Sequence, residues 1–145
     1  MSLGKKYMLS AGKDVSGKDR KISFVIPAGV KHIDEIQSII DLIKQYAEMH
    51  GVTYADIPQF HRMVTCYDIY IGCFEVVAEK GSTMMNQRGE CVKRPEVNIM
   101  RENWAQYLEI AKQYGFTPRS SKMTNGLSDQ GDDSPADMFF KRNER

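Results

Sequence analysis

The side chains of this chain with the most versatile chemistry are three histidines and three cysteines. His32, His50 and His61 lie too far apart for a paired metal site, and none stands at zinc-finger spacing from two cysteines. Cys66 and Cys73 are seven residues apart and form no Cys-x-x-Cys pair, so packing on a helix face is the expected role of both. We therefore predict no metal site and no cofactor.

Catalytic chemistry has equally little support. The carboxylates of Asp56, Asp68 and Glu75 cannot be paired from the sequence with a Ser, Cys or His in a catalytic arrangement. The glycine-lysine stretch at residues 12–14 lacks the four-residue spacer and the Lys-Ser/Thr ending of a phosphate-binding loop. We predict that the chain is not an enzyme.

Basic side chains offer a different chemistry, the binding of a polyanion. Residues 1–32 contain seven Lys or Arg against two Asp, whereas the whole 145-residue chain has a formal net charge of +1. Several glycines and little apolar periodicity predict that residues 1–31 form a flexible basic arm, in which residues 22–26 could be a short strand or an extended docking segment. Such arms bind nucleic acid by counterion release, and the alternative role is a solvating tail. The candidate DNA contacts in the arm are Lys5, Lys6, Lys13, Lys18, Arg20 and Lys21.

A second, smaller basic cluster lies at the two ends of the last predicted helix. Its members are further candidates for contact with DNA phosphates. They are Arg88, Lys93, Arg94, Arg119 and Lys122.

Three predicted helices position these residues. Apolar residues at helical spacing predict one helix over residues 32–50, a second from after Thr53 to Lys80, and a third that starts at Pro95 and stops at Gly115. Residues 83–86 and 90–93 flank Gly89 and predict a short β-hairpin or turn between the second and third helices. The expected fold is mainly α: a long helical hairpin, a third C-terminal helix and flexible tails.

The predicted elements divide the chain into three parts. Residues 1–31 are the basic flexible arm, residues 32–118 a helical core and oligomerisation domain, and residues 119–145 a flexible C-terminal tail rich in Ser, Asn, Gly and Asp.

An aromatic stripe follows the second and third predicted helices. Such a stripe is more typical of packing than of a base-stacking platform. A bundle this thin commonly completes its burial against copies of itself, so we expect a homo-oligomer. The expected oligomer contacts are Phe60, Tyr67, Tyr70, Phe74, Trp104 and Tyr107.

The composition of the chain indicates the cellular compartment in which the protein is expected. Hydrophobic residues make up 41% of the chain, and no apolar run approaches the ~18 residues that cross a bilayer. The N-terminus has no apolar signal region, and an odd number of cysteines does not make a closed disulfide framework. We expect a cytoplasmic protein with no membrane partner.

Residues 33–123 combine a basic turn, a helix started by Pro95 and the exit Gly115-Phe116-Thr117-Pro118. In this order they resemble the small terminase subunit family of tailed double-stranded DNA phages. Two positions depart from the family pattern. Arg94 stands where that family usually has Asn, and Ser121 follows Ser120 where the family has Arg after Ser.

The resemblance implies a non-catalytic, ring-forming component of a viral DNA-packaging motor in the cytoplasm of a bacterial host. It implies three partners: double-stranded viral DNA, a large subunit that carries the ATPase and nuclease, and further copies of the chain. The apolar cluster Met138, Phe139 and Phe140 ends a polar tail and is the expected docking segment for the large subunit. The alternatives are a small dimeric helical DNA-binding transcriptional regulator and a structural adaptor without DNA contact.

Overall fold

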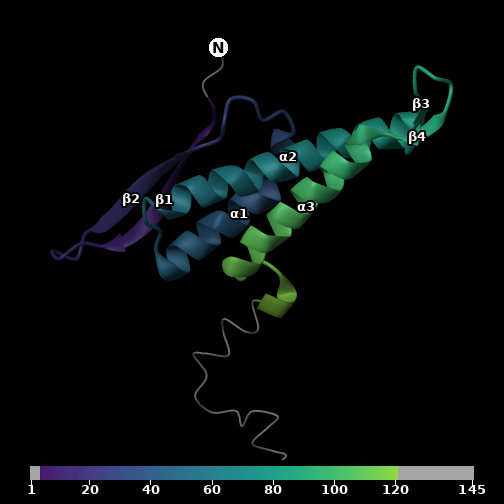
Figure 1. Ribbon diagram of the computed structural model, residues 1–145. Helices are drawn as coiled ribbons and strands as arrows, with labels where there is room; N and C mark the ends of the chain where they lie inside the picture. The colour runs from purple at the N-terminus through teal and green to yellow at the C-terminus, as the bar shows by residue number, and fades with distance from the viewer. Residues whose placement is uncertain (1–3, 121–145) are drawn as a thin grey trace, which may run out of the picture. The chain divides into compact units, whose positions relative to one another are not determined.

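The computed structural model describes residues 4–120 (Figure 1). The chain divides into two units, residues 1–111 and residues 112–145. Its elements, in order, are β1 (Lys6–Lys13), β2 (Asp19–Val25), α1 (Ile33–His50), α2 (Asp56–Lys80), β3 (Thr83–Met85), β4 (Cys91–Lys93) and α3 (Pro95–Gln113). The prediction of a mainly helical fold is therefore confirmed.

Strands β1 and β2 form an antiparallel hairpin in the segment that was expected to be a flexible arm. Tyr7 pairs with Phe24 and Leu9 with Ile22, and all four side chains are buried. The residues between them in each strand are exposed, as alternation in a half-buried sheet requires. The prediction of an arm without a fold is wrong for these residues, because this alternating apolar face packs on the helices.

The core lies between the hairpin and the first two helices. The inner face of β1 packs on α1, whose buried residues recur at helical spacing. From α2, Phe60 joins this core with its ring 6.2 Å from that of Phe24, in an edge-on orientation. The hydrophobic side chains buried on these two helices are Ile36, Ile39, Ile40, Ile43, Ala47, Phe60, Met63, Val64 and Cys66. Each large apolar side chain buried there contributes about 1.5–3 kcal/mol.

The helix boundaries follow the local signals predicted from the sequence. Helix α1 ends at Gly51, which has a φ of 71° and donates its N–H to the carbonyl oxygen of Ala47 at 2.8 Å. Before α2, the carboxylate of Asp56 accepts hydrogen bonds from the backbone N–H of Thr53 at 2.8 Å and from its hydroxyl at 3.2 Å. This is the side-chain half of a capping arrangement at the predicted helix start.

Beyond Asp68 the first unit becomes thinner. Helix α2 continues for twelve residues to Lys80 without a further buried side chain, and α3 buries only Ile110 and Ala111 among its described residues. The strands β3 and β4 close the far end of this two-helix extension (residues 69–109), as Figure 1 shows. Gly89, with a φ of 77°, lies in the hairpin loop as predicted.

In the second unit, the exit sequence after α3 stops one helix and starts another turn. The Oγ of Ser120 accepts the backbone N–H of Thr117 at 3.2 Å, and the hydroxyl of Thr117 accepts the N–H of Ser120 at 3.3 Å. This reciprocal pair is a capping box around Pro118, which stands at the first helical position. The exit is therefore an architectural feature.

Candidate nucleic-acid and subunit interfaces

The carboxylate of Asp14 holds the turn between β1 and β2 together with two backbone hydrogen bonds. Oδ1 of Asp14 accepts hydrogen bonds from the hydroxyl of Ser16 at 2.6 Å, from its N–H at 2.9 Å and from the N–H of Lys18 at 3.0 Å. The Ser16 hydroxyl, followed by the Lys18 N–H, lowers the pKa of Asp14. The negative charge of Asp14 is thus used to order the turn that carries the neighbouring cations.

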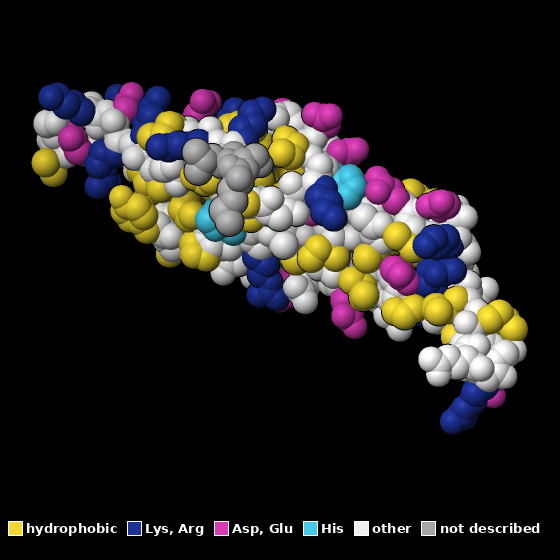
Figure 2. Space-filling view, turned by 90° about the horizontal axis from the view of Figure 1, so that it is seen from above, with side chains coloured by type: hydrophobic (Ala, Val, Ile, Leu, Met, Phe, Trp, Pro, Cys, Tyr) yellow, Lys and Arg dark blue, Asp and Glu magenta, His cyan; other side chains and the backbone are white. Residues whose placement is uncertain are grey.

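The six predicted cations of the N-terminal segment are all exposed on or beside this hairpin: Lys5, Lys6, Lys13, Lys18, Arg20 and Lys21. Lys6 and Lys21 lie on the outer face, opposite the buried face of Tyr7 and Phe24. Figure 2 shows Lys and Arg side chains gathered at one end of the molecule, where the tip of the hairpin lies. The fold therefore concentrates these charges on one folded element.

The second predicted basic cluster is divided between the two units of the chain. Arg88 and Lys93 are exposed on the β3–β4 hairpin, and Arg119 is exposed in the second unit. Lys122 lies outside the described residues, as do Met138, Phe139 and Phe140.

Arg94 has a structural role that the sequence did not indicate. Its Nε donates to the carbonyl oxygen of Gly81 at 3.0 Å, and Nη2 lies 3.4 Å from the carbonyl oxygens of Lys80 and Thr83. A guanidinium group in this position satisfies carbonyls left open at the end of α2. Arg94 therefore caps α2 in this structure, and its contact with DNA stays a prediction.

The two basic regions of the first unit are far apart along α2. The ring of Phe24 on β2 stacks on His61 near the start of α2, with the centroids 5.0 Å apart. Strand β3 begins only after Lys80 at the other end. The step of nineteen positions from His61 to Lys80 corresponds to roughly 28 Å of helix, so one short duplex contact does not cover both regions.

An aromatic seam joins α2 to α3. The ring of Tyr67 is 5.3 Å from that of Tyr107, and the ring of Tyr70 is 5.0 Å from that of Trp104. Phe74 extends the seam, with its ring stacked 6.4 Å from Tyr70. Burial, with a smaller effect from Tyr67, raises the pKa of Tyr107. These five residues line the seam between α2 and α3 within one chain. Their contact with another copy stays a prediction.

Phe60, which was predicted to belong with them, is 0% exposed. Its ring packs inside the chain against Phe24. A side chain without exposed surface cannot contact a neighbouring copy, so this assignment was wrong and Phe60 is a core residue.

The exposed part of the extension is more apolar than the sequence indicated. Phe74 is 52% and Trp104 38% exposed, and other large apolar side chains are also exposed on the same elements. The signal in the sequence was that α2 is apolar around more than one face, which marks a helix with two packing partners. The additional residues are Ile69, Met84, Met85 and Ile99.

Polar contacts also join α2 to α3 where the two-helix extension begins. Oε1 of Gln106 accepts a hydrogen bond from Nη2 of Arg62 at 3.1 Å and from Sγ of Cys66 at 3.5 Å. Burial raises the pKa of the Cys66 thiol, which matches a packed, protonated cysteine.

The described part of the chain contains neither a candidate metal site nor a candidate membrane-spanning helix. Within residues 4–120, no group of three or more His, Cys, Asp or Glu side chains has a geometry that could hold a metal ion. None of the helices in that same range is both long and apolar enough to cross a membrane.

Comparison with known proteins identifies the family. A family model described as phage terminase, small subunit matches residues 40–130, which is more than half of the chain. The chain belongs to the phage terminase small subunit family. The resemblance seen in the sequence is thereby confirmed, and with it a general connection to DNA packaging. No curated protein and no solved structure gives a match.

The match to the terminase small subunit family covers only part of the surfaces described above. It begins within α1, includes α2, β3, β4 and α3, and continues past the described residues. The aromatic seam lies inside it, and the basic β1–β2 hairpin lies outside it. The family relation therefore says nothing specific about the hairpin.

Proposed function

We propose that this chain is the non-catalytic DNA-recognition and regulatory subunit of a viral genome-packaging motor. It acts in the cytoplasm of the bacterial host with a large subunit that carries the ATPase and nuclease. Its membership of the phage terminase small subunit family supports this role. The observation that carries the proposal is a folded basic hairpin attached to an acidic helical body.

The charge distribution favours the hairpin as the DNA contact. Residues 1–32 hold seven basic and two acidic residues, whereas residues 33–118 hold eight basic and twelve acidic ones. Lys13, Lys18 and Arg20 are exposed around the ordered turn, whose Asp14 is engaged in its own hydrogen bonds. Phosphates are attracted to this element and repelled by the helices, so binding that depends on charge occurs at the hairpin.

The experiment measures affinity for duplex DNA over a range of salt concentrations. A variant with Lys13, Lys18 and Arg20 changed to Gln is compared with a control in which Lys80, Arg101 and Lys112, exposed on the helices, are changed to Gln. The hairpin variant should bind DNA more weakly. The slope of log K against the logarithm of the salt concentration should become less steep by about 0.9 for each phosphate that the protein no longer neutralises. The control should lose less affinity than the hairpin variant, because its three cations lie on the acidic helices.

Equal reductions of affinity in the two variants would remove the hairpin from the proposal. No binding of the unaltered chain even at low salt would favour a structural adaptor.

The other parts of the proposal concern protein partners. The aromatic seam forms the contact between copies in a ring, because it combines large, partly exposed aromatic side chains with a thin two-helix support.

Met138, Phe139 and Phe140 bind the large subunit, because an apolar cluster in a polar tail suits a segment that orders on binding. Co-purification of the large subunit should be abolished when these three residues become Ser, with DNA binding retained.

A further inference from the structure

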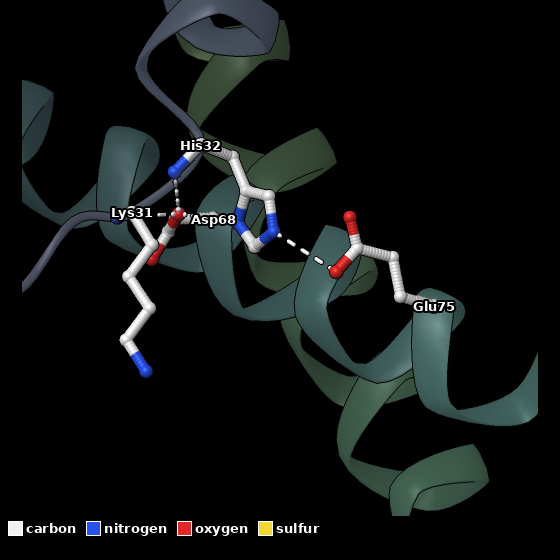
Figure 3. A network of polar contacts seen from close by, with 4 residues as sticks. All are labelled: Lys31, His32, Asp68 and Glu75. Atoms are coloured by element: carbon white, nitrogen blue, oxygen red, sulfur yellow. Dashed lines mark hydrogen bonds and ion pairs between the residues drawn. The ribbon is translucent and has the colours of Figure 1, made fainter.

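His32 lies between the hairpin and α1, and its imidazole ring bridges two carboxylates of α2 (Figure 3). Nδ1 is 2.8 Å from Oδ1 of Asp68, and Nε2 is 3.2 Å from Oε2 of Glu75. Asp68 and Glu75 are seven residues apart, which is about two turns of helix, so both project toward the ring from one face. The bridge joins residues that are 36 and 43 positions apart in the sequence.

The same oxygen of Asp68 also holds the backbone at the start of α1. It accepts the N–H of His32 at 2.9 Å and the N–H of Lys31 at 3.1 Å. Asp68 is 8% exposed and is the one buried charged residue within residues 4–120. A buried carboxylate is costly unless several donors compensate for the water it gives up, and this junction supplies three.

The number of protons on the ring decides whether both contacts can exist. A neutral imidazole has one N–H donor and one lone pair, whereas an imidazolium has two N–H donors. Both ring nitrogens face a carboxylate oxygen, so the protonated ring satisfies both contacts and the neutral ring satisfies one. The hydrogen bond to Asp68 raises the pKa of His32, burial of the ring opposes this, and Glu75 adds to the rise.

The two carboxylates are not equivalent. Asp68 is buried and shared with two backbone donors, whereas the side chain of Glu75 is 60% exposed and can return to water. Among other charged groups near the ring, Lys31 directs its ammonium group away from it (Figure 3), and Asp34 and Glu35 occupy the first turn of α1. Loss of one proton therefore breaks the contact with Glu75 first.

We propose that His32 is a protonation-dependent latch between the hairpin–α1 junction and α2. In its charged form it bridges Asp68 and Glu75, and in its neutral form it keeps Asp68 and releases Glu75. His32 is thus a positioning residue for the segment that connects β2 to α1. The latch is independent of DNA binding, so its failure and the failure of the proposed function are separate results.

The direction of the pH dependence follows from linkage. A histidine whose pKa is higher in the folded than in the unfolded chain binds its proton more tightly when folded. The stability that this adds is complete below the ordinary value of 6.5 and disappears as the pH rises through the folded-state pKa. The latch is therefore closed at low pH and opens at high pH.

The test is an NMR titration of the histidine ring protons in the full chain. The signal of His32, identified by its disappearance in His32→Gln, should titrate with a midpoint above 6.5. In Glu75→Gln, which alters only an exposed side chain, this midpoint should fall toward 6.5. The midpoint of His50, exposed at the end of α1, should not change and is the control.

Urea unfolding between about pH 5.5 and 8.5 supplies the second measurement. The unaltered chain should lose more stability across this range than Glu75→Gln does. A His32 midpoint at or below 6.5 would overturn the proposal, as would a Glu75→Gln variant with the same midpoint or the same stability profile as the unaltered chain.

Discussion

At the scale of single residues, Arg94 shows how one side chain can join elements that are distant in sequence. It directly precedes Pro95 at the start of α3, and its guanidinium group contacts carbonyl oxygens at the end of α2 and on β3. These contacts fix the direction in which the chain leaves α2 and enters the short hairpin. The departure from the family pattern at this position therefore has a local structural use.

Arg94→Ala should destabilise the chain by about 1–2 kcal/mol, because carbonyl groups at the end of α2 lose a charged hydrogen-bond donor. The matched control is Arg88→Ala, whose exposed side chain makes no hydrogen bond within residues 4–120 and should change stability by less than about 0.5 kcal/mol. The measurement is the urea midpoint of unfolding. Equal midpoints for the two variants would contradict the capping role.

At the scale of elements, the β1–β2 hairpin belongs to both the core and the surface. Its inner face supplies Tyr7, Leu9, Ile22 and Phe24 to the core, and its outer face and turn present the cations. Removing the hairpin therefore removes packing as well as charge. A truncation cannot be read as a test of DNA binding alone.

Deletion of residues 1–25 should destabilise the helices that remain. Four large apolar side chains at about 1.5–3 kcal/mol each are comparable with the whole ~5–15 kcal/mol stability of a domain. We expect a strongly lowered melting temperature by circular dichroism and increased binding of a hydrophobic dye. The variant with Lys13, Lys18 and Arg20 changed to Gln should melt like the unaltered chain, and a truncated chain that did so as well would show that the hairpin is not part of the core.

At the scale of the whole molecule, the central question is how many copies assemble. The two-helix extension exposes large apolar side chains on both of its helices, including Phe74 and Trp104. Exposed large apolar side chains of this kind are typical of interaction sites. It lies within the part of the chain matched by the phage terminase small subunit family, so assembly through this surface fits the proposed role.

Native mass spectrometry should find the full chain as a closed oligomer larger than a dimer. Phe74→Glu, at a side chain that is 52% exposed, should shift the population to smaller species because it places a charge in the proposed contact. The control is Tyr54→Glu, at an aromatic side chain that is 80% exposed and lies outside the seam. This variant should assemble with the same number of subunits as the unaltered chain. A stable dimer for the unaltered chain would instead favour a dimeric transcriptional regulator.

The sequence by itself was sufficient for the three helices, their ends and the small β3–β4 hairpin. Those features depend on periodicity, on Pro95 and on glycines such as Gly51 and Gly89, which act over a few residues. It was also sufficient for the family, because the exit sequence after α3 is a short local pattern.

Only the tertiary structure decided which of these residues meet. It turned the expected arm into a core hairpin, placed Phe60 inside and Phe74 outside, and brought His32 to Asp68 across 36 positions. Contacts between residues so far apart in the sequence depend on how the elements pack. The spacing of residues along one element does not identify the element against which it packs. For this reason local pattern was enough for the elements of this protein, whereas its surfaces and its buried polar junction required the fold.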